Sequence, residues 1–245
     1  MYRFFVDKEQ VGDEDVVILG QDVNHIKNVL RMKNGETILI SDGEDREYVC
    51  EIINLESDKV RAKIIDVNGP SRELPIKVHL YQGLAKGDKM ETVIQKMVEL
   101  GAYRIVPVAT KRAVVKLDDK KAKAKTSRWN AISESAAKQS KRGIIPEVSQ
   151  VMNFKEALQD AENLNVVLIP YEEAENMEYT RSVIAKISSG DSVGIFIGPE
   201  GGFAPEEVEM AKAIGALPIT LGKRILRTET AGMALMSVLM FAMEE

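Results

Sequence analysis

The stretch IGPEGGFAPEEVEMAK, residues 197–212, decides how the second half of the chain folds. It continues an apolar run at residues 192–197, which predicts a buried strand. Three glycines and one proline surround a single carboxylate, Glu200, and Pro205 is typical of the first turn of a helix. The stretch therefore predicts a strand, a tight glycine-rich turn and a helix in direct succession.

Strands and helices alternate on both sides of this turn. Apolar spacing predicts helices at residues 88–100, 125–140, 205–214 and 228–243. Strands are predicted at residues 76–81, 104–109, 166–169, 193–198 and 218–222. Such alternation is typical of an α/β layer with a mostly parallel sheet.

The first 70 residues have a different pattern. Short apolar runs predict strands at residues 16–19, 37–41, 47–53 and 60–67, with one helix near residues 22–31. These elements predict a small β-barrel with one helix. Turn-forming residues cluster at 68–72, so we expect one domain at residues 1–70 and a second at residues 71–245.

The composition excludes several classes of protein. The chain has 245 residues, and it contains no apolar run of about 18 residues, so a transmembrane helix is not expected. Its N-terminus does not resemble a signal peptide, and Cys50 is its only cysteine. With two histidines besides, a Cys/His metal site is not expected either. We expect a cytoplasmic protein without a metal.

Charge is unevenly distributed along the chain. Residues 76–143 carry 16 Lys and Arg against 6 Asp and Glu, although the whole chain has a net charge of −5. A concentrated positive surface attracts polyanions even on an acidic protein. The lysine-rich run at residues 118–125 has a second interpretation, a solvated helix.

Three turns follow three of the predicted strands. In open α/β sheets, ligands bind beyond the carboxyl ends of the strands. The phosphate-binding loop and the dinucleotide fingerprint are both absent, and a phosphate at the glycine-rich turn would meet Glu200. Glycines allow close backbone approach, so a nucleoside or a sulfonium fits this turn better. The alternative is a tight turn whose carboxylate only complements the helix dipole.

The motifs at these turns resemble a known family. The stretches FIGPEGGFAPEEVEMA (residues 196–211) and LGKRILRTETAGMAL (residues 221–235) are similar to the paired C-terminal motifs of SPOUT-class RNA methyltransferases, and more narrowly to the RsmE family. Residues 25–43, 82–108 and 128–148 extend the resemblance over nearly the whole chain. It implies a SPOUT-type C-terminal domain with a deep trefoil knot and an N-terminal PUA-like β-barrel.

The resemblance also implies an activity. Members of the family methylate N3 of a uridine in 16S ribosomal RNA of the small subunit, use S-adenosylmethionine, and work as homodimers. Two alternatives stay open: methylation of another RNA position, such as a ribose 2′-hydroxyl, and a ribosome-assembly protein that binds RNA without catalysis.

The resemblance places the cofactor among the three turns. The residues expected to bind it are Leu168, Ile169, Pro170, Tyr171, Ile197, Gly198, Pro199, Glu200, Gly201, Gly202, Leu221, Gly222, Ile225, Leu226, Thr230 and Ala231. Glu200 has two possible roles here, to bind a ribose hydroxyl or to support its own turn.

Arg227, in the third turn, is the expected catalytic residue. Uridine N3 carries a proton and becomes nucleophilic when that proton leaves, and a fixed cation near the uracil carbonyls stabilises the resulting negative charge. The alternative role for Arg227 is a salt bridge to Glu229 or Glu200. Solvent hydroxide, Glu229 and a backbone carbonyl all remain candidates for the proton acceptor.

Basic and polar residues of both predicted domains are expected to contact RNA phosphates, which fix register rather than sequence. They are Arg3, His25, Arg31, Lys33, Lys86, Lys89, Arg112, Gln139 and Arg142. His25 also fits a structural role, and Trp129 fits either base stacking or the core.

Overall fold

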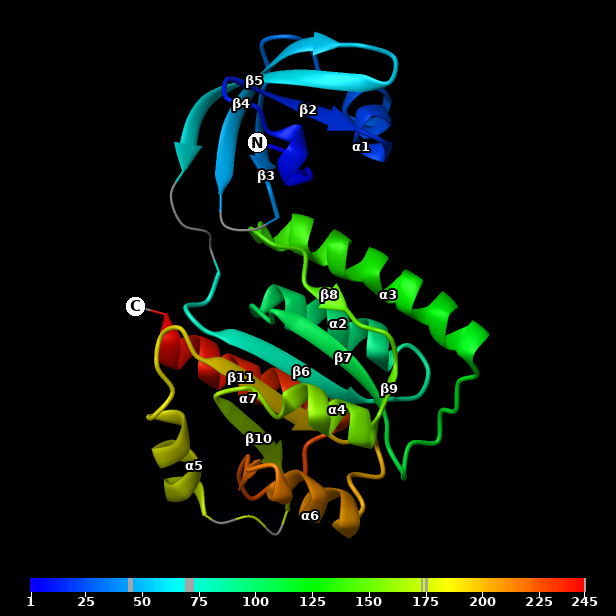
Figure 1. The fold of residues 1–245 in the computed structure, drawn as a ribbon, viewed down its shortest axis with the longest axis vertical. Helices are drawn as coiled ribbons and strands as arrows, with labels where there is room; N and C mark the ends of the chain where they lie inside the picture. The colour runs from blue at the N-terminus through cyan, green and yellow to red at the C-terminus, as the bar shows by residue number, and fades with distance from the viewer. Residues whose placement is uncertain (44–45, 69–72, 173, 175, 245) are drawn as a thin grey trace. The chain divides into compact units, whose positions relative to one another are not determined.

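The computed structural model describes residues 1–43, 46–68, 73–172, 174 and 176–244. It forms two units, Met1–Glu73 with Ala137–Ile145, and Leu74–Ala136 with Pro146–Glu245 (Figure 1). The predicted boundary between residues 70 and 71 lies outside the described residues. The first unit also includes a segment from the middle of the chain, because the Arg3 guanidinium donates a hydrogen bond to the Arg142 carbonyl oxygen at 2.6 Å.

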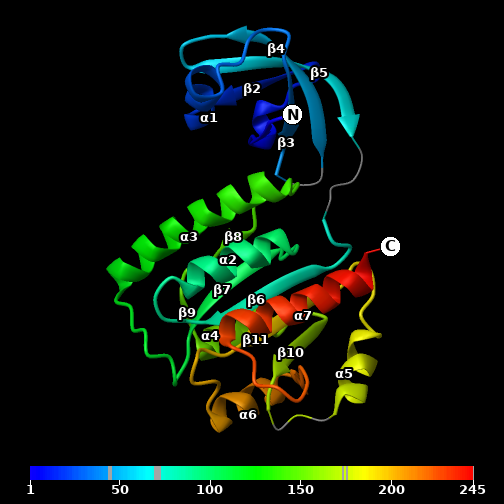
Figure 2. The ribbon, with the colours of Figure 1, turned by 180° about the vertical axis from the view of Figure 1, so that it is seen from behind.

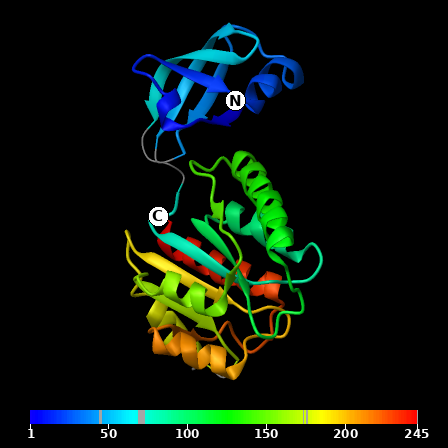
Figure 3. The same ribbon diagram turned by 45° about the vertical axis from the view of Figure 1, so that its right-hand side comes forward.

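The first unit is built on a curled five-stranded sheet in the order β1-β3-β4-β5-β2 (Figure 3). Its strands are β1 (Arg3–Phe5), β2 (Asp15–Leu19), β3 (Thr37–Ser41), β4 (Glu47–Leu55) and β5 (Lys59–Asn68). β1 and β3 are parallel, and the other pairs are antiparallel. The four predicted strands are confirmed, whereas β1, with three residues, is too short to show a period in the sequence.

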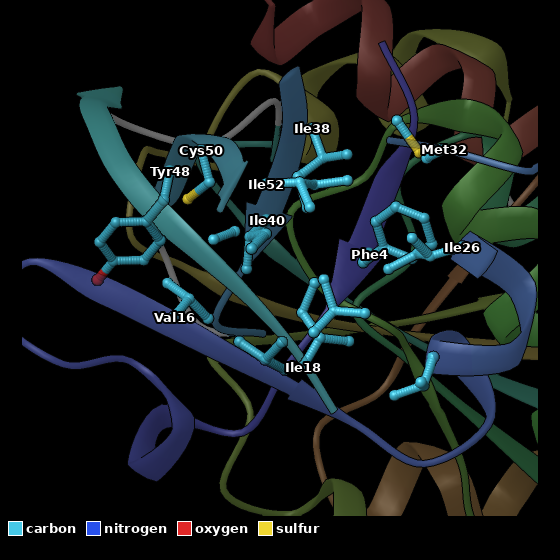
Figure 4. Close-up of a cluster of buried hydrophobic side chains, with 14 residues drawn as sticks. Phe4, Val16, Ile18, Ile26, Met32, Ile38, Ile40, Tyr48, Cys50 and Ile52 are labelled. Atoms are coloured by element: carbon cyan, nitrogen blue, oxygen red, sulfur yellow. The ribbon is translucent and has the colours of Figure 1, made fainter. Parts of the chain in front are cut away.

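The core of this unit follows the two-residue period of its strands. Every second residue of β2, of β3 and of β4 as far as Ile52 is buried, as Val16, Ile18, Ile38 and Ile40 illustrate (Figure 4). The predicted helix at residues 22–31 is confirmed in part. α1 (Gln21–Asn24) continues as a π-helix (His25–Val29), and the helix ends before Arg31, whose φ is 53°.

Cys50 is fully buried in β4. Burial raises the pKa of its thiol from 9.0 to about 12. The unfolded chain therefore loses the thiol proton first, and stability is lost as the pH rises from 9.0 towards 12.

Between about pH 8 and about pH 10.5, we expect the free energy of unfolding to fall by about 2 kcal/mol more in the wild type than in Cys50→Ala. Urea unfolding of the two chains measures this, and equal pH dependence would contradict it.

The second unit contains a sheet in the order β12-β10-β11-β6-β7-β8, with β9 paired to β7. Its strands are β6 (Lys77–Gly83), β7 (Arg104–Ala109), β8 (Glu147–Val148), β9 (Met152–Asn153), β10 (Val166–Pro170), β11 (Ser192–Ile197) and β12 (Leu217–Ile219). All of its strand pairs are parallel. The predicted α/β fold with a mostly parallel sheet is confirmed.

Helices cover both faces of this sheet: α2 and α7 lie on one face, and α4 and α6 on the other (Figures 1 and 2). Among the described residues the helices that follow β6 are α2 (Lys89–Glu99), α3 (Asp119–Ser140), α4 (Phe154–Ala161), α5 (Met177–Ile184), α6 (Pro205–Ala213) and α7 (Thr228–Met243). On the α4 and α6 face, the rings of Tyr81 and Phe196 stack with centroids 4.3 Å apart. Ring stacking and apolar burial thus fix the two strands that lead towards the glycine-rich turn.

The described residues contain no helix that combines the length and hydropathy needed to cross a lipid bilayer. They also contain no group of three or more His, Cys, Asp or Glu side chains placed to hold a metal ion.

Candidate functional site

The three predicted turns meet at one edge of the second sheet. β12, β10 and β11 are neighbours and parallel, so their carboxyl ends lie side by side. The Tyr171 amide, after β10, donates a hydrogen bond to the Ile219 carbonyl oxygen of β12 at 3.0 Å. The Thr228 hydroxyl, at the start of α7, donates to the Gly198 carbonyl oxygen after β11 at 2.6 Å. The turns are therefore joined to one another by hydrogen bonds.

The glycine-rich turn after β11 needs its glycines. A Cβ on Gly198 would lie 3.1 Å from Gly202 Cα, and Gly202 has a φ of 65°, in the left-handed region. A Cβ on Gly201 would lie 3.2 Å from the Arg112 carbonyl oxygen and Cβ. A side chain at Gly198 or Gly201 would therefore require its neighbours to shift, and one at Gly202 would strain the backbone.

The end of β6 packs directly against this turn. A Cβ on Gly83 would lie 2.6 Å from both the nitrogen and Cδ of Pro199. Beside it, the fully buried Gln82 donates from Nε2 to the Thr228 hydroxyl oxygen at 2.8 Å. Thr228 in turn donates to Gly198, so β6, α7 and the turn are linked through two side chains.

Glu200 holds its turn against the start of α2. Its carboxylate accepts hydrogen bonds from the Lys86 amide at 3.1 Å and from Lys89 Nζ at 3.0 Å. Burial works against the charged form, but the hydrogen bonds prevail and lower the pKa of Glu200 below its usual value. Hydrogen bonding to Glu200 likewise raises the pKa of Lys89. These contacts favour the predicted supporting role of Glu200 over a contact with ribose.

The third turn begins earlier than the sequence predicted. The strand expected at residues 218–222 ends at Ile219, because the Thr220 amide donates to the Thr180 hydroxyl of α5 at 3.1 Å instead of to a strand. Gly222, with a φ of 109°, also lies outside the range of a strand. The turn at the expected cofactor residues is therefore longer than predicted.

The expected cofactor residues are of two kinds. Leu168 and Ile169 lie inside β10 with fully buried side chains, so their side chains belong to the core of the unit. The backbone amides of Leu221, Ile225 and Leu226 donate no hydrogen bond to any residue that the structure describes. Free amide donors beside a glycine-rich turn fit a ligand with hydrogen-bond acceptors, such as adenine or ribose.

Arg227 directly precedes α7, and its carbonyl oxygen accepts hydrogen bonds from the amides of Thr230 at 2.9 Å and Ala231 at 2.8 Å. Its backbone is thus fixed, while the residue is exposed. Within the described residues its guanidinium forms no salt bridge with Glu229 or Glu200, the alternative considered above. Lys89 Nζ lies near both of these carboxylates instead, at 3.5 Å and 3.0 Å.

Two of the expected RNA contacts have another role in the structure. Arg3 is buried and its guanidinium lies against the Glu47 carboxylate at 2.5 Å. Arg142 is also buried, and its Nε donates to Glu73 Oε1 at 2.8 Å. Both arginines neutralise carboxylates inside the first unit, so we leave them out of the RNA-binding surface.

The other expected RNA contacts differ in their exposure and in whether they already bind another residue of the protein. His25, Arg31, Lys33, Lys86 and Gln139 are exposed. Lys89 is engaged by Glu200, and Arg112 Nη1 donates to the Gly201 carbonyl oxygen at 3.3 Å. Trp129 is 2% exposed, which confirms the core interpretation over base stacking.

Sequence reasoning missed Gln82 and Thr228. The only signal was the position of Gln82, a polar residue that directly follows the apolar pair Leu80 and Tyr81 at the end of the strand. The contact joins residues 146 positions apart.

Two family models match this chain. A family model described as RNA methyltransferase domain matches residues 72–240, and one described as RNA methyltransferase PUA domain matches residues 18–65. The second match confirms the predicted PUA-like domain.

Two relatives match over nearly their whole length. The chain is 39% identical over 250 residues to ribosomal RNA small subunit methyltransferase E of Bacillus subtilis (strain 168), covering 100% of this chain and 98% of the relative. It is 36% identical to the protein of the same name from Mesomycoplasma hyopneumoniae, covering 97% and 98%. Among solved structures, ribosomal RNA small subunit methyltransferase E from Neisseria gonorrhoeae bound to S-adenosyl methionine matches with a TM-score of 0.82 and 31% identity, covering 98% of this chain and 96% of that one.

Proposed function

Because this chain belongs to the RNA methyltransferase family, we propose that it transfers a methyl group from S-adenosylmethionine to N3 of a uridine in 16S ribosomal RNA of the small subunit. One observation carries the proposal: the turns after three neighbouring parallel strands are joined at one edge of the sheet. A solved relative of the same fold holds S-adenosyl methionine.

The residues at this edge fit the cofactor. The tight turn at residues 198–202 lets a ligand approach the backbone, and the free amides of Leu221, Ile225 and Leu226 offer donors to its adenine and ribose. When bound, S-adenosylmethionine supplies a methyl group on a positively charged sulfur. We further propose that α7 is threaded as part of a deep trefoil knot, so that all three turns enclose the cofactor.

Arg227 acts on the uracil in this proposal. As N3 loses its proton, negative charge spreads to the neighbouring carbonyl oxygens, and a guanidinium held beside them stabilises that charge. The fixed backbone of Arg227 and its lack of a salt bridge to Glu229 or Glu200 leave the side chain available for this role.

RNA reaches the site along basic surfaces of the chain. In the first unit these are His25, Arg31 and Lys33, and in the second Lys86 and Arg112. We propose that Gln139 also contacts the RNA.

We propose that the protein acts in the cytoplasm, where ribosomal subunits are assembled.

We also propose a homodimer. Two large apolar side chains on the last turns of α7, Val238 and Phe241, are 49% and 86% exposed. Burial of exposed apolar side chains drives association, so a second copy of the chain is a suitable partner for this end of the helix. Light scattering of the purified protein measures the oligomeric state.

Lysines at the start of α3 extend the RNA surface. Lys120 and Lys123 are exposed, and neither forms a salt bridge within the described residues. Positive charge in the first turn of a helix is unfavourable, so the helix itself gives no reason for Lys120 at this position. Attraction to RNA phosphates gives a reason for both lysines that solvation alone does not.

Replacing Lys120 and Lys123 together by glutamine is expected to weaken RNA binding and to reduce its salt dependence. Each lost phosphate contact lowers the slope of log affinity against log salt by about 0.7. Filter binding with small-subunit RNA at several salt concentrations measures both effects. The matched control replaces Lys155 and Lys186, also exposed lysines of the second unit, and should leave the slope unchanged. An unchanged slope in the α3 variant would assign its lysines to solvation.

The proposed function is tested on small-subunit RNA from a strain that lacks the gene. Incubation with the protein and S-adenosylmethionine should restore one N3-methyluridine, detected by nucleoside mass spectrometry. A 2′-O-methylated nucleoside instead would assign a different RNA position. No product, together with no calorimetric binding of S-adenosylmethionine, would favour the non-catalytic RNA-binding protein.

A further inference from the structure

A chain of hydrogen bonds crosses the centre of the second unit. Gln82, at the end of β6, is fully buried, and its Nε2 donates to the Thr228 hydroxyl oxygen at 2.8 Å and to the Gly83 carbonyl oxygen at 3.1 Å. Thr228 is buried too, and its hydroxyl donates in turn to the Gly198 carbonyl oxygen at 2.6 Å. One amide and one hydroxyl thus join β6, the start of α7 and the glycine-rich turn.

Stability alone does not account for Gln82. Its Oε1 is buried and has no hydrogen-bond donor among the described residues, which costs free energy relative to an apolar side chain. Its neighbours Leu80, Tyr81 and Leu84 are all buried and mainly apolar. A local cost of this kind is expected where a residue serves a function.

These hydrogen bonds hold two segments of the proposed site, the glycine-rich turn and the start of α7. Gly198 begins the turn at the expected cofactor residues, and Thr228 directly follows Arg227. Arg227 is tied to the first turn of α7, because its carbonyl oxygen accepts two amide hydrogen bonds from that turn. The Thr228 hydroxyl therefore sets the position of Arg227 relative to the glycine-rich turn.

We propose that Gln82 and Thr228 are positioning residues for methyl transfer, which hold the glycine-rich turn and Arg227 in the arrangement that the reaction requires. This inference rests on the proposed function. Methyl transfer depends steeply on geometry, since a displacement of about 1 Å can slow an enzyme about 100-fold. Loss of the Thr228 hydroxyl should therefore affect the rate more than the stability.

The test replaces Thr228 by valine, which keeps the shape and removes the hydroxyl. We expect kcat to fall about 100-fold. We also expect S-adenosylmethionine to bind about tenfold more weakly by calorimetry, which corresponds to a loss of about 1.4 kcal/mol of binding free energy. Thr228→Ser keeps the hydroxyl and should restore both values to near wild type.

The matched control is Ser133→Ala. The buried Ser133 also donates its hydroxyl to a backbone carbonyl oxygen, that of Pro146, away from the proposed site. Both variants should lower the melting temperature by similar amounts, but Ser133→Ala should leave kcat and cofactor affinity unchanged. Equal loss of kcat in the two variants would reduce the role of Thr228 to general stability and overturn the inference.

Gln82 is tested by a double-mutant cycle of Gln82→Met and Thr228→Val. If both act through the same hydroxyl, the loss of kcat in the double variant will be smaller than the product of the single losses. Independent losses, or a Thr228→Val variant with wild-type kcat, would overturn the inference. A wild type that binds S-adenosylmethionine but methylates no ribosomal RNA would instead refute the proposed function, and the cofactor affinities of the variants would still decide whether the pair positions the turn.

Discussion

Arg227→Ala is expected to slow methyl transfer by about 100- to 1,000-fold while S-adenosylmethionine binds as tightly as before. In the proposed mechanism the guanidinium stabilises charge that develops on the uracil only as N3 loses its proton, so its loss should raise the barrier without affecting the bound cofactor. Single-turnover transfer of a labelled methyl group to small-subunit RNA measures the rate, and calorimetry measures cofactor affinity.

The matched control is Arg224→Ala. Arg224 lies three residues earlier in the same turn and is also exposed, so its loss removes the same charge from the same loop. We expect this variant to weaken RNA binding with little effect on the single-turnover rate at saturating RNA. If the two variants lose the same rate, or if Arg227→Ala is restored to full rate by more RNA, then Arg227 binds phosphate and does not act on the base.

The elements of the fold that could be predicted are those whose own residues show a clear apolar period. β3, Thr37–Ser41, and α7, Thr228–Met243, match their predicted bounds, because long or strictly periodic apolar runs are decided by their own residues. β8 and β9 have two residues each and form only because β7 offers an edge to pair with. Elements of this kind depend on tertiary structure, which a single sequence does not display.

The burial of Arg3 and Arg142 also depends on tertiary structure and was not predictable from the sequence. Arg3 and Arg142 look like the exposed basic residues Arg31 and Lys33 in the sequence, since charge and residue type are alike. Their burial depends on partners 44 and 69 positions away, Glu47 and Glu73. Charge counting therefore predicted that a basic surface exists, but not which cations form it.

The site was predictable as three turns and not as a set of contacts. The motifs place Gly198 after β11 and Arg227 after β12, the two strands on either side of β10, and parallel strands bring their carboxyl ends to one edge. The link through Gln82 depends on the register of β6 against β11, in which Gln82 lies beside Ile197. Register is set by packing across the whole sheet, so no local motif records it.

Gly83→Ala is expected to damage the same site from the opposite side of the glycine-rich turn. The added Cβ would lie 2.6 Å from the Pro199 nitrogen and 3.0 Å from the Gly198 carbonyl carbon. Backbone atoms yield far less easily than the end of a side chain, so β6 and the turn must move apart. We expect a loss of about 1–3 kcal/mol of stability, which lowers the melting temperature by about 2–12 °C in a chain of this size.

The displacement falls on the turn that is expected to hold the cofactor, so the affinity for S-adenosylmethionine should fall at least about tenfold, beyond what the loss of stability requires. Gly232→Ala is the control, since its added Cβ would meet Ile197, Leu80 and Met97 at ordinary contact distances of 3.6 to 3.8 Å. In the interior of α7 this change should raise the melting temperature slightly, because alanine favours helix over glycine by about 1 kcal/mol. Wild-type cofactor affinity in Gly83→Ala would mean that the turn moves as a rigid body, and would separate the packing of β6 from cofactor binding.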